Sequence, residues 1–215
     1  NLLEKIQAPI PATLYGAMLA GVDVVVMGAG IPVQVPGILD RLARHLPVSY
    51  QLDVHGDAPG SGPHVDLEPA ALLPGIDRAC GVLRRPAFLP IVSSTVLAKS
   101  LLRRASGTIE GFVVEAPCAG GHNAPPRGPL RLSDAGEPLY GAKDLVEPEQ
   151  MAALGLPVWL AGGEDTPERL QQALAHGAAG VQVGTAFAFC AESGLAPRLR
   201  RWVLESVRAG RAAVR

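Results

Sequence analysis

The chain has 215 residues, of which 48% are hydrophobic, and its 19 lysines and arginines nearly balance its 20 acidic residues. This composition predicts one soluble globular domain. A net charge of -1 provides no basic footprint for nucleic acid or for an anionic membrane surface, so we expect small molecules as partners.

Cysteine usage and apolar runs indicate the compartment. Cys80, Cys118 and Cys190 are widely spaced and form no CxxC or His–Cys metal pattern, so the sequence suggests neither a disulfide framework nor a zinc site. No run of about 18 apolar residues and no basic-then-apolar leader occurs, so we expect no membrane span, no secretion signal and a cytoplasmic location. The chain begins with Asn1 rather than Met, so this N-terminus need not be the natural one.

The first 46 residues predict a βα unit. Asn1 to Ala20 has apolar residues at helical intervals, which predicts a helix interrupted by prolines. Val22 to Met27 is almost continuously β-branched, as in a strand buried on both faces of a parallel sheet. Gly28, Ala29 and Gly30 end that strand, and Pro36 to Leu46 returns to helical periodicity.

Residues 48–86 are less regular and are interpreted as an insertion. Val48 to Val54 is compatible with a strand, and His55 to Pro63 is dense in glycine, proline and polar residues, which predicts a flexible loop. The histidines and aspartates of this segment match no metal-ligand spacing, so a metal cluster is not favoured.

The strand, loop and helix pattern then repeats. Expected strands are Phe88 to Ser93, Phe112 to Glu115, Pro157 to Ala161 and Gly180 to Val183. Expected helices cover Val96 to Leu102 with Ser94 or Thr95 as N-cap, Pro148 to Leu154, the segment around Leu170 to Leu174, and the spacing of Leu199, Val203 and Val207. With the first unit, five short apolar strands end in small-residue loops, which indicates an α/β barrel or a doubly wound sheet.

The strand Phe112 to Glu115 opens into the chain's most distinctive loop. Gly120 and Gly121 carry no Cβ and allow a ligand to approach the backbone closely, and His122 is suited to proton transfer near neutral pH. The alternative interpretation is a tight turn whose histidine only caps or solvates the loop.

Two later loops favour the barrel. The segment Ala161, Gly162 and Gly163 and the pair Gly184 and Thr185 follow successive strands and expose bare backbone N–H groups. In a (β/α)8 barrel, the loops after the last two strands commonly bind a phosphate. No strand is followed by GxGxxG, which argues against a Rossmann-like sheet. The alternative is that these are ordinary turn glycines.

Three motifs, in order, give the chain a family resemblance: the Ala-Gly-Gly-His loop within Glu115 to Asn123, Pro157 to Gly163, and Gly177 to Phe187. The chain resembles the nitronate monooxygenase family, formerly 2-nitropropane dioxygenases, which shares its FMN-binding barrel with FMN-dependent enoyl reductases. The resemblance implies that His122 is the catalytic acid/base. It implies FMN binding by Gly120, Gly121, Ala161, Gly162, Gly163, Gln182, Val183, Gly184 and Thr185.

The resemblance also sets the functional expectations. The first is oxidation of a nitronate or nitroalkane with O2. The alternatives are an enoyl-thioester reductase that uses NAD(P)H, and a non-catalytic truncated barrel that serves as an interaction module. Val22 to Met27 resembles the family's fourth strand, so a (β/α)8 barrel without its first βα units is expected, with exposed strand edges that favour association, including homo-oligomers.

Three side chains near the loop have open or secondary roles. Lys143 and Asp144 either face the site or face solvent. Cys118 is expected to be a small buried residue rather than a flavin contact.

Overall fold

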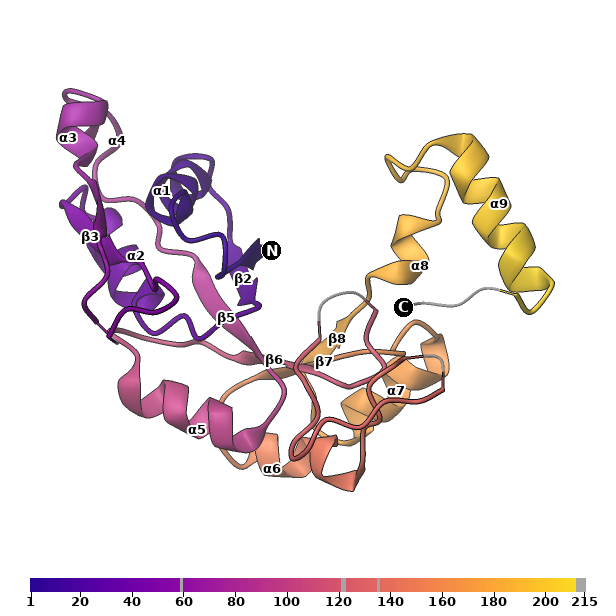
Figure 1. Cartoon of the computed structure of the whole chain (residues 1–215). Coiled ribbons are helices and arrows are strands. Elements are labelled where there is room, and N and C mark those ends of the chain that lie inside the picture. The colour runs from indigo at the N-terminus through magenta and orange to yellow at the C-terminus, as the bar shows by residue number, and fades with distance from the viewer. Residues whose placement is uncertain (59, 121–122, 135, 212–215) are drawn as a thin grey trace. The chain divides into compact units, whose positions relative to one another are not determined.

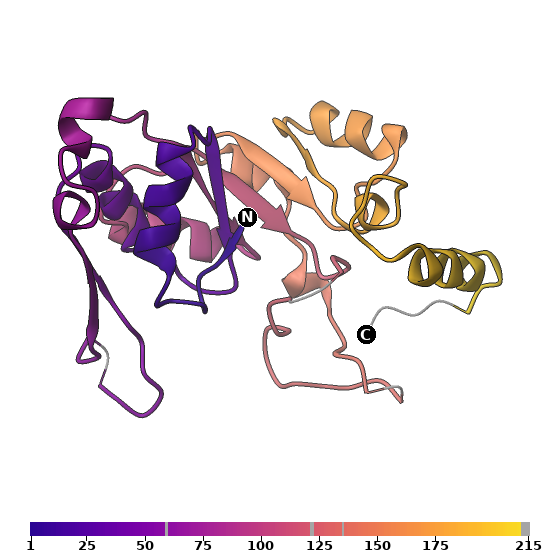
Figure 2. The ribbon, with the colours of Figure 1, turned by 90° about the horizontal axis from the view of Figure 1, so that it is seen from above.

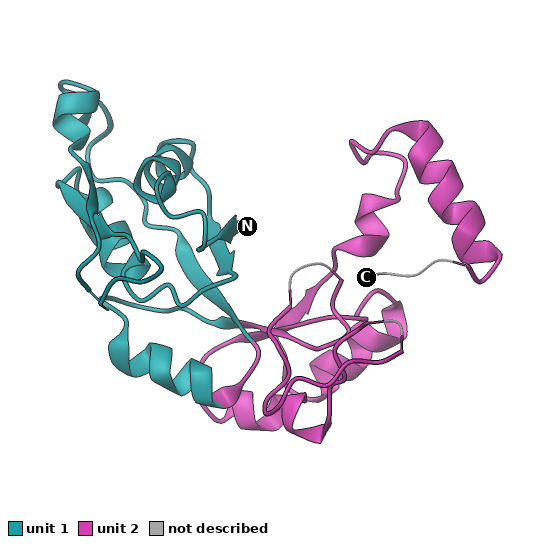
Figure 3. Cartoon of the chain, viewed as in Figure 1, with its two compact units in different colours: residues 1–92, 96–112 teal, residues 93–95, 113–215 magenta. Residues whose placement is uncertain are grey.

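The computed structural model describes residues 1–58, 60–120, 123–134 and 136–211. They form two compact units (Figure 3): unit 1 contains residues 1–92 and 96–112, and unit 2 contains residues 93–95 and 113–215. Each unit combines short parallel strands with helices (Figure 1). None of the described helices is long and apolar enough to cross a membrane.

The sheet of unit 1 has the order β1-β2-β5, with β1 at Leu2–Leu3, β2 at Val24–Gly28 and β5 at Ala87–Val92. All neighbours are parallel, and Val25 pairs with Phe88 in register. These bounds confirm the strands predicted near residues 22–27 and 88–93. The helix expected from Asn1 is wrong at its start, because Leu2 and Leu3 pair with Met27 and Gly28 instead.

Three helices of unit 1 bury apolar side chains against its sheet or against each other. They are α1 (Ile10–Leu19), α2 (Val35–Leu42) and α5 (Thr95–Arg104). Pro11 lies in the first turn of α1, where a missing N–H costs nothing. Leu14, Leu39 and Leu101 are buried, which confirms these parts of the apolar faces that the 3.6-residue spacing predicted. Val96 and Leu102, expected on the apolar face of α5, are instead 76% and 40% exposed.

The segment expected as an insertion contains a hairpin and two short helices. β3 (Val48–Gln51) pairs antiparallel with β4 (His64–Leu67), and α3 (Pro69–Leu72) and α4 (Ile76–Cys80) follow. Figure 2 shows the turn of the hairpin projecting from unit 1. The side-chain amide of Gln34 donates to the Gln51 carbonyl and accepts the Gln51 N–H, both at 2.9 Å, which fixes the end of the ladder next to the turn. The Tyr50 hydroxyl donates to Glu4 Oε1 at 2.7 Å.

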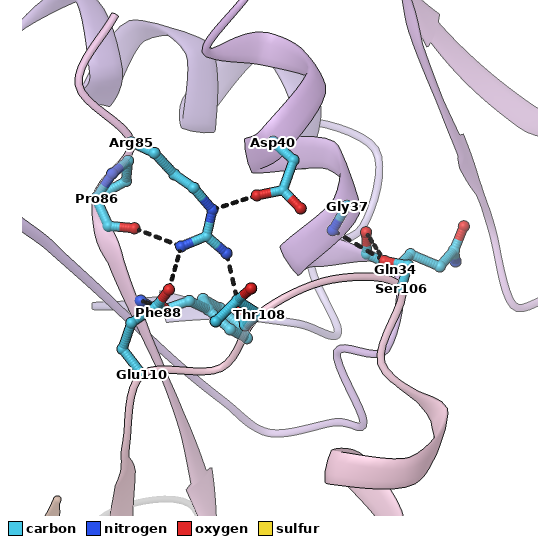
Figure 4. A network of polar contacts seen from close by, with 9 residues as sticks. All are labelled: Gln34, Gly37, Asp40, Arg85, Pro86, Phe88, Ser106, Thr108 and Glu110. Atoms are coloured by element: carbon cyan, nitrogen blue, oxygen red, sulfur yellow. Dashed lines mark hydrogen bonds and ion pairs between the residues drawn. The ribbon is translucent and has the colours of Figure 1, made fainter. Parts of the chain in front are cut away.

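Arg85, which is half-buried, connects α2, the start of β5 and residues 108–110, which precede β6 (Figure 4). Arg85 Nε donates to Asp40 at 2.5 Å, Nη1 to Glu110 at 2.7 Å and Nη2 to the Thr108 carbonyl at 2.7 Å. The second Glu110 oxygen accepts the N–H of Phe88 at 2.7 Å. The guanidinium group of Arg85 therefore has all its partners inside unit 1.

The sheet of unit 2 has the order β6-β7-β8, with β6 at Phe112–Glu115, β7 at Val158–Ala161 and β8 at Gly180–Gln182. This confirms the three strands predicted in the second half. The helices are η1 (Ala142–Asp144), α6 (Pro148–Ala152), α7 (Pro167–Ala175), α8 (Thr185–Ala188) and α9 (Pro197–Arg208). The Thr166 side chain caps α7 by accepting the N–H of Arg169 at 3.2 Å.

Candidate functional site

The loops after β7 and β8 begin at the same edge of the sheet. The two strands are parallel, and Ala161 pairs with Gln182 at their carboxyl ends. Gly162 and Gly163 therefore leave the sheet level with Val183 and Gly184. The register brings together the two predicted phosphate loops.

Backbone conformation explains the two adjacent glycines. Gly162 and Gly163 have φ angles of +104° and +73°, a region that favours glycine. A Cβ on Gly162 would lie 3.1 Å from both Ala116 Cβ and the Ala119 nitrogen. Gly162 is thus required twice, by its φ angle and by the close approach of the loop that follows β6.

The exposed N–H groups at this edge fit an anion. Gly163, Gly184 and Thr185 are exposed, and within the described ranges none of their backbone N–H groups has an acceptor. A Cβ built on Gly184 would meet nothing within 4 Å, so there is open space beside this backbone. Free N–H groups from two neighbouring strand ends match the donors that a flavin phosphate requires. Ala161 is buried and Gln182 and Val183 are half-buried behind them.

The loop after β6 is attached to the loop after β7. The Ala116 N–H donates to the Ala161 carbonyl at 2.8 Å. The Asn123 amide donates to the carbonyls of Pro117 at 2.8 Å and Ala119 at 3.1 Å. Gly120 is exposed. Gly121 and His122 lie outside the described residues, so the roles predicted for them stay predictions.

A clamp follows this loop. The carboxylate of Asp144 is buried and accepts the N–H groups of Arg127 and Gly141, each at 2.7 Å. The Arg127 guanidinium donates to the carbonyls of Ser93 and Lys143. The backbone donors Gly141 and Arg127 lower the pKa of Asp144. Of the two charges left open by the sequence, Asp144 is therefore a structural acceptor, and the Lys143 side chain is exposed.

A small hollow lies between the clamp and the end of β6. Its lining includes Glu115, Ser93, Asn123 and Tyr140, and it has room for about one water molecule. Glu115 is half-buried, and burial raises the pKa of its carboxyl group. No functional role is predicted for Glu115 from the sequence motifs, although its position at the carboxyl end of a barrel strand is a signal for one.

The prediction for Cys118 is wrong. Cys118 is exposed rather than buried, and its Sγ lies 3.7 Å from the position of a Cβ on Gly163. The residue follows a proline in a turn outside the sheet, where no packing layer covers it. It lies beside the candidate phosphate loop.

The comparisons with known proteins agree with this arrangement. The family model for nitronate monooxygenase matches residues 85–210, which is more than half of the chain. The chain belongs to the nitronate monooxygenase family. The match includes β5 to β8 and the three loops just described.

Individual relatives extend the comparison. A "Probable nitronate monooxygenase" of Bacillus subtilis (strain 168) is 34% identical over 116 residues, covering 54% of this chain and 31% of the relative. The solved structure of a FabK mutant from Thermotoga maritima aligns with a TM-score of 0.55 and 19% identity, covering 95% of this chain and 49% of that one. The chain spans about a third of the first protein's length and about half of the second's.

The structural likeness confirms the predicted fold class, an α/β fold of the barrel type with a parallel sheet. In the described residues, each unit contributes three parallel strands, whereas a complete barrel of this type has eight. The short strand β1, which the sequence analysis missed, precedes the segment that resembles the family's fourth strand.

Proposed function

We propose that this chain is the phosphate-binding part of an FMN-dependent oxidoreductase that oxidises nitronates or nitroalkanes with O2. The supporting observation is the pair of loops at the ends of β7 and β8, held level by the Ala161–Gln182 pairing. Their free N–H groups, in a chain of the nitronate monooxygenase family, fit the phosphate of FMN.

The residues divide the work of holding the cofactor. The backbone N–H groups of Gly163, Gly184 and Thr185 would donate hydrogen bonds to the phosphate. Gly162 allows the loops that follow β6 and β7 to approach each other. Ala161, Gln182 and Val183 form the strand ends below them, and Gly120 and Gly121 complete the site on the β6 side. FMN supplies the two-electron redox chemistry when bound.

His122 is the proposed acid/base. Its role follows from the family resemblance: the imidazole removes the proton from the carbon next to the nitro group. Asn123, directly after it, is held by two backbone carbonyls, which fixes the chain on that side of His122. A small nitro compound and O2 are the proposed reaction partners.

The first experiment is a visible absorption spectrum of the purified chain, followed by identification of the flavin that heat releases. Flavin bands with released FMN support the proposal. A colourless protein that cannot be reconstituted with FMN and that co-purifies with another chain would replace it by the interaction-module alternative.

The second experiment separates the enzymatic alternatives. Nitronate-dependent O2 uptake by the flavin-loaded protein supports the proposal, whereas NAD(P)H oxidation with an enoyl thioester and no O2 uptake would support the reductase. His122→Ala should remove turnover and retain flavin. The matched control is His176→Ala, because His176 is exposed and pairs only with Glu149 at 2.7 Å among the described residues.

A further inference from the structure

Unit 1 contains a groove that the proposed flavin chemistry does not use. It has a volume of about 450 Å³, in the range of small-ligand sites, and lies between the end of α2 and residues 82–85. Arg85 and Pro86 directly precede β5, so the groove is at the amino end of this strand. The loops assigned to FMN instead follow the carboxyl ends of strands.

The two walls of the groove are bonded to each other. The Leu83 N–H donates to the Ala43 carbonyl at 2.8 Å, and His45 Nε2 lies 2.6 Å from the Gly81 carbonyl oxygen. His45 has a φ angle of +55° and is held on its other ring nitrogen by the Tyr15 hydroxyl at 2.7 Å. The strained backbone at His45 is held in place because both ring nitrogens of this residue have partners. The groove therefore has a defined shape before any ligand binds.

Two of its arginines have unused donors. Arg41 and Arg44 lie three residues apart at the end of α2, and both are exposed. Arg41 uses Nε to bind the Pro47 carbonyl at 2.8 Å, and among the described residues its two terminal nitrogens have no partner, so they can bind a ligand. The Arg44 N–H donates to the Arg41 carbonyl at 3.0 Å, and its guanidinium group has no hydrogen bond or ion pair with any described residue.

The other charges at the groove are paired with each other. Arg85 is committed to Asp40, Glu110 and two backbone carbonyls (Figure 4). Asp40 shares Arg85 with Glu110, so three arginines (Arg41, Arg44 and Arg85) stand against two carboxylates, a net charge of +1. The groove therefore presents a positive charge from two guanidinium groups.

Beside this charge the groove is apolar. Val82 is 77% exposed and Leu46 is 40% exposed, and both line it together with Leu83. Exposed aliphatic side chains next to uncommitted arginines complement a ligand with an anionic head and an apolar chain.

We propose that this groove binds a small amphiphilic anion, a carboxylate or phosphate that carries an aliphatic chain, with Arg41 and Arg44 on the head and Val82 and Leu46 on the chain. The inference does not depend on flavin binding. It places a second ligand site of the chain in unit 1, separate from the proposed FMN site in unit 2.

The test is a titration of the isotope-labelled full chain, followed by NMR of arginine Nε–H and valine and leucine methyl signals. The probes are octanoate and octyl phosphate, with inorganic phosphate as head alone and octyl glucoside as an uncharged chain. We expect saturable shifts of Val82 and Leu46 methyl signals with octanoate or octyl phosphate, with a Kd on the order of 1 mM or tighter. Whichever of octanoate and octyl phosphate binds with the lower Kd identifies the preferred head group.

Variants connect the binding to the named residues. Arg41→Gln/Arg44→Gln should weaken binding about tenfold or more, and Val82→Ser should weaken it about threefold. The matched control, Arg103→Gln/Arg104→Gln, removes the same charge from exposed residues of the last turn of α5 and should leave the Kd unchanged. Unchanged thermal melting of each variant shows that it is folded.

Three results would overturn the proposal: no saturable shift up to about 10 mM probe, equal binding of octyl glucoside, or equal loss in the control pair. Adding FMN should leave the octanoate Kd unchanged. A chain that binds octanoate but no FMN would refute the proposed function alone, and the reverse would refute only this groove.

Discussion

The two units differ in what they bury. Of the twelve largest fully buried side chains among the described residues, Met151 alone lies in unit 2, and the other eleven lie in unit 1. Unit 2 instead buries small residues such as Ala161, Ala173 and Ala178 and exposes Phe187 and Trp202. Unit 1 therefore has the core with the larger side chains, whereas unit 2 buries Met151 with smaller ones such as Val113 and Val158.

This difference indicates that a bound ligand should contribute a larger share of the folding stability in unit 2 than in unit 1. Burial of large apolar side chains dominates folding, and a region with few of them gains proportionally more from a bound cofactor. Both tryptophans, Trp159 and Trp202, lie in unit 2, so tryptophan fluorescence reports on this unit. Amide exchange of β2 and β5 reports on unit 1.

The largest expected effect comes from the core of unit 1. Leu39→Ala should lower the free energy of unfolding by about 2–5 kcal/mol, because Leu39 is fully buried and leaves a cavity. The measurement is denaturant dependence of β2 and β5 amide exchange. For comparison, Ala173→Gly on α7 in unit 2, followed by tryptophan fluorescence in urea, should lose only about 1 kcal/mol. Equal losses would contradict the contrast between the units.

The backbone contact of unit 2 gives the next effect. Gly162→Ala should cost about 1–3 kcal/mol, because φ is +104° and the new Cβ would press on Ala119 and Ala116. Tryptophan fluorescence in urea measures the loss. The control is Gly184→Ala, with ordinary negative φ and open space, which should change stability by less than about 1 kcal/mol. A Gly162→Ala protein as stable as the control would show that the two loops do not press together.

The Asp144 clamp should give a smaller, pH-dependent effect. Its pKa is lowered from an ordinary value of 3.8, so its contribution to stability is complete above that pH and is lost as pH falls through the folded-state pKa. Asp144→Asn should thus lower the midpoint of urea unfolding, followed by tryptophan fluorescence, at pH 7. Toward pH 2 the midpoints of the variant and the parent protein should become equal. A difference that did not change with pH would mean that the ionised carboxylate is not the acceptor.

Glu115 should give the smallest effect, with the opposite sign. Burial raises its pKa, so the carboxyl favours the folded state most at low pH, and this stability is lost as pH rises through the folded-state pKa. Glu115→Gln should leave stability near pH 4 unchanged and raise it slightly at pH 7. A decrease at pH 7 would show that the ionised group has a partner in the fold.

Sequence periodicity located β2, β5, β6, β7 and β8 because each strand is a short apolar run with glycine or another small residue after it. It missed β1 and β4, since Leu2–Leu3 is too short for any pattern and His64–Leu67 becomes a strand only by pairing with residues 48–51. Pairing of this kind depends on contacts that local sequence does not encode.

The candidate site was partly predictable for the same reason. Glycines after β7 and β8 are visible in the sequence, and their common level follows from the parallel order of the strands. The clamp of Arg127 by Asp144 joins residues 17 positions apart across irregular chain, and no spacing rule reveals such a bond. The exposure of Cys118 was missed because cysteine is usually buried.

The clamp has a consequence for how this chain can change. Arg127 and Asp144 fasten the two ends of an excursion whose described part includes a short antiparallel ladder, with Leu132 opposite Pro138 and the Leu139 N–H bonded to the Arg131 carbonyl. Because Asp144 fixes its ends, we expect that a change in the length or sequence of this excursion leaves β6 undisturbed. It is a natural place for relatives to diverge, and for an engineer to graft a new sequence.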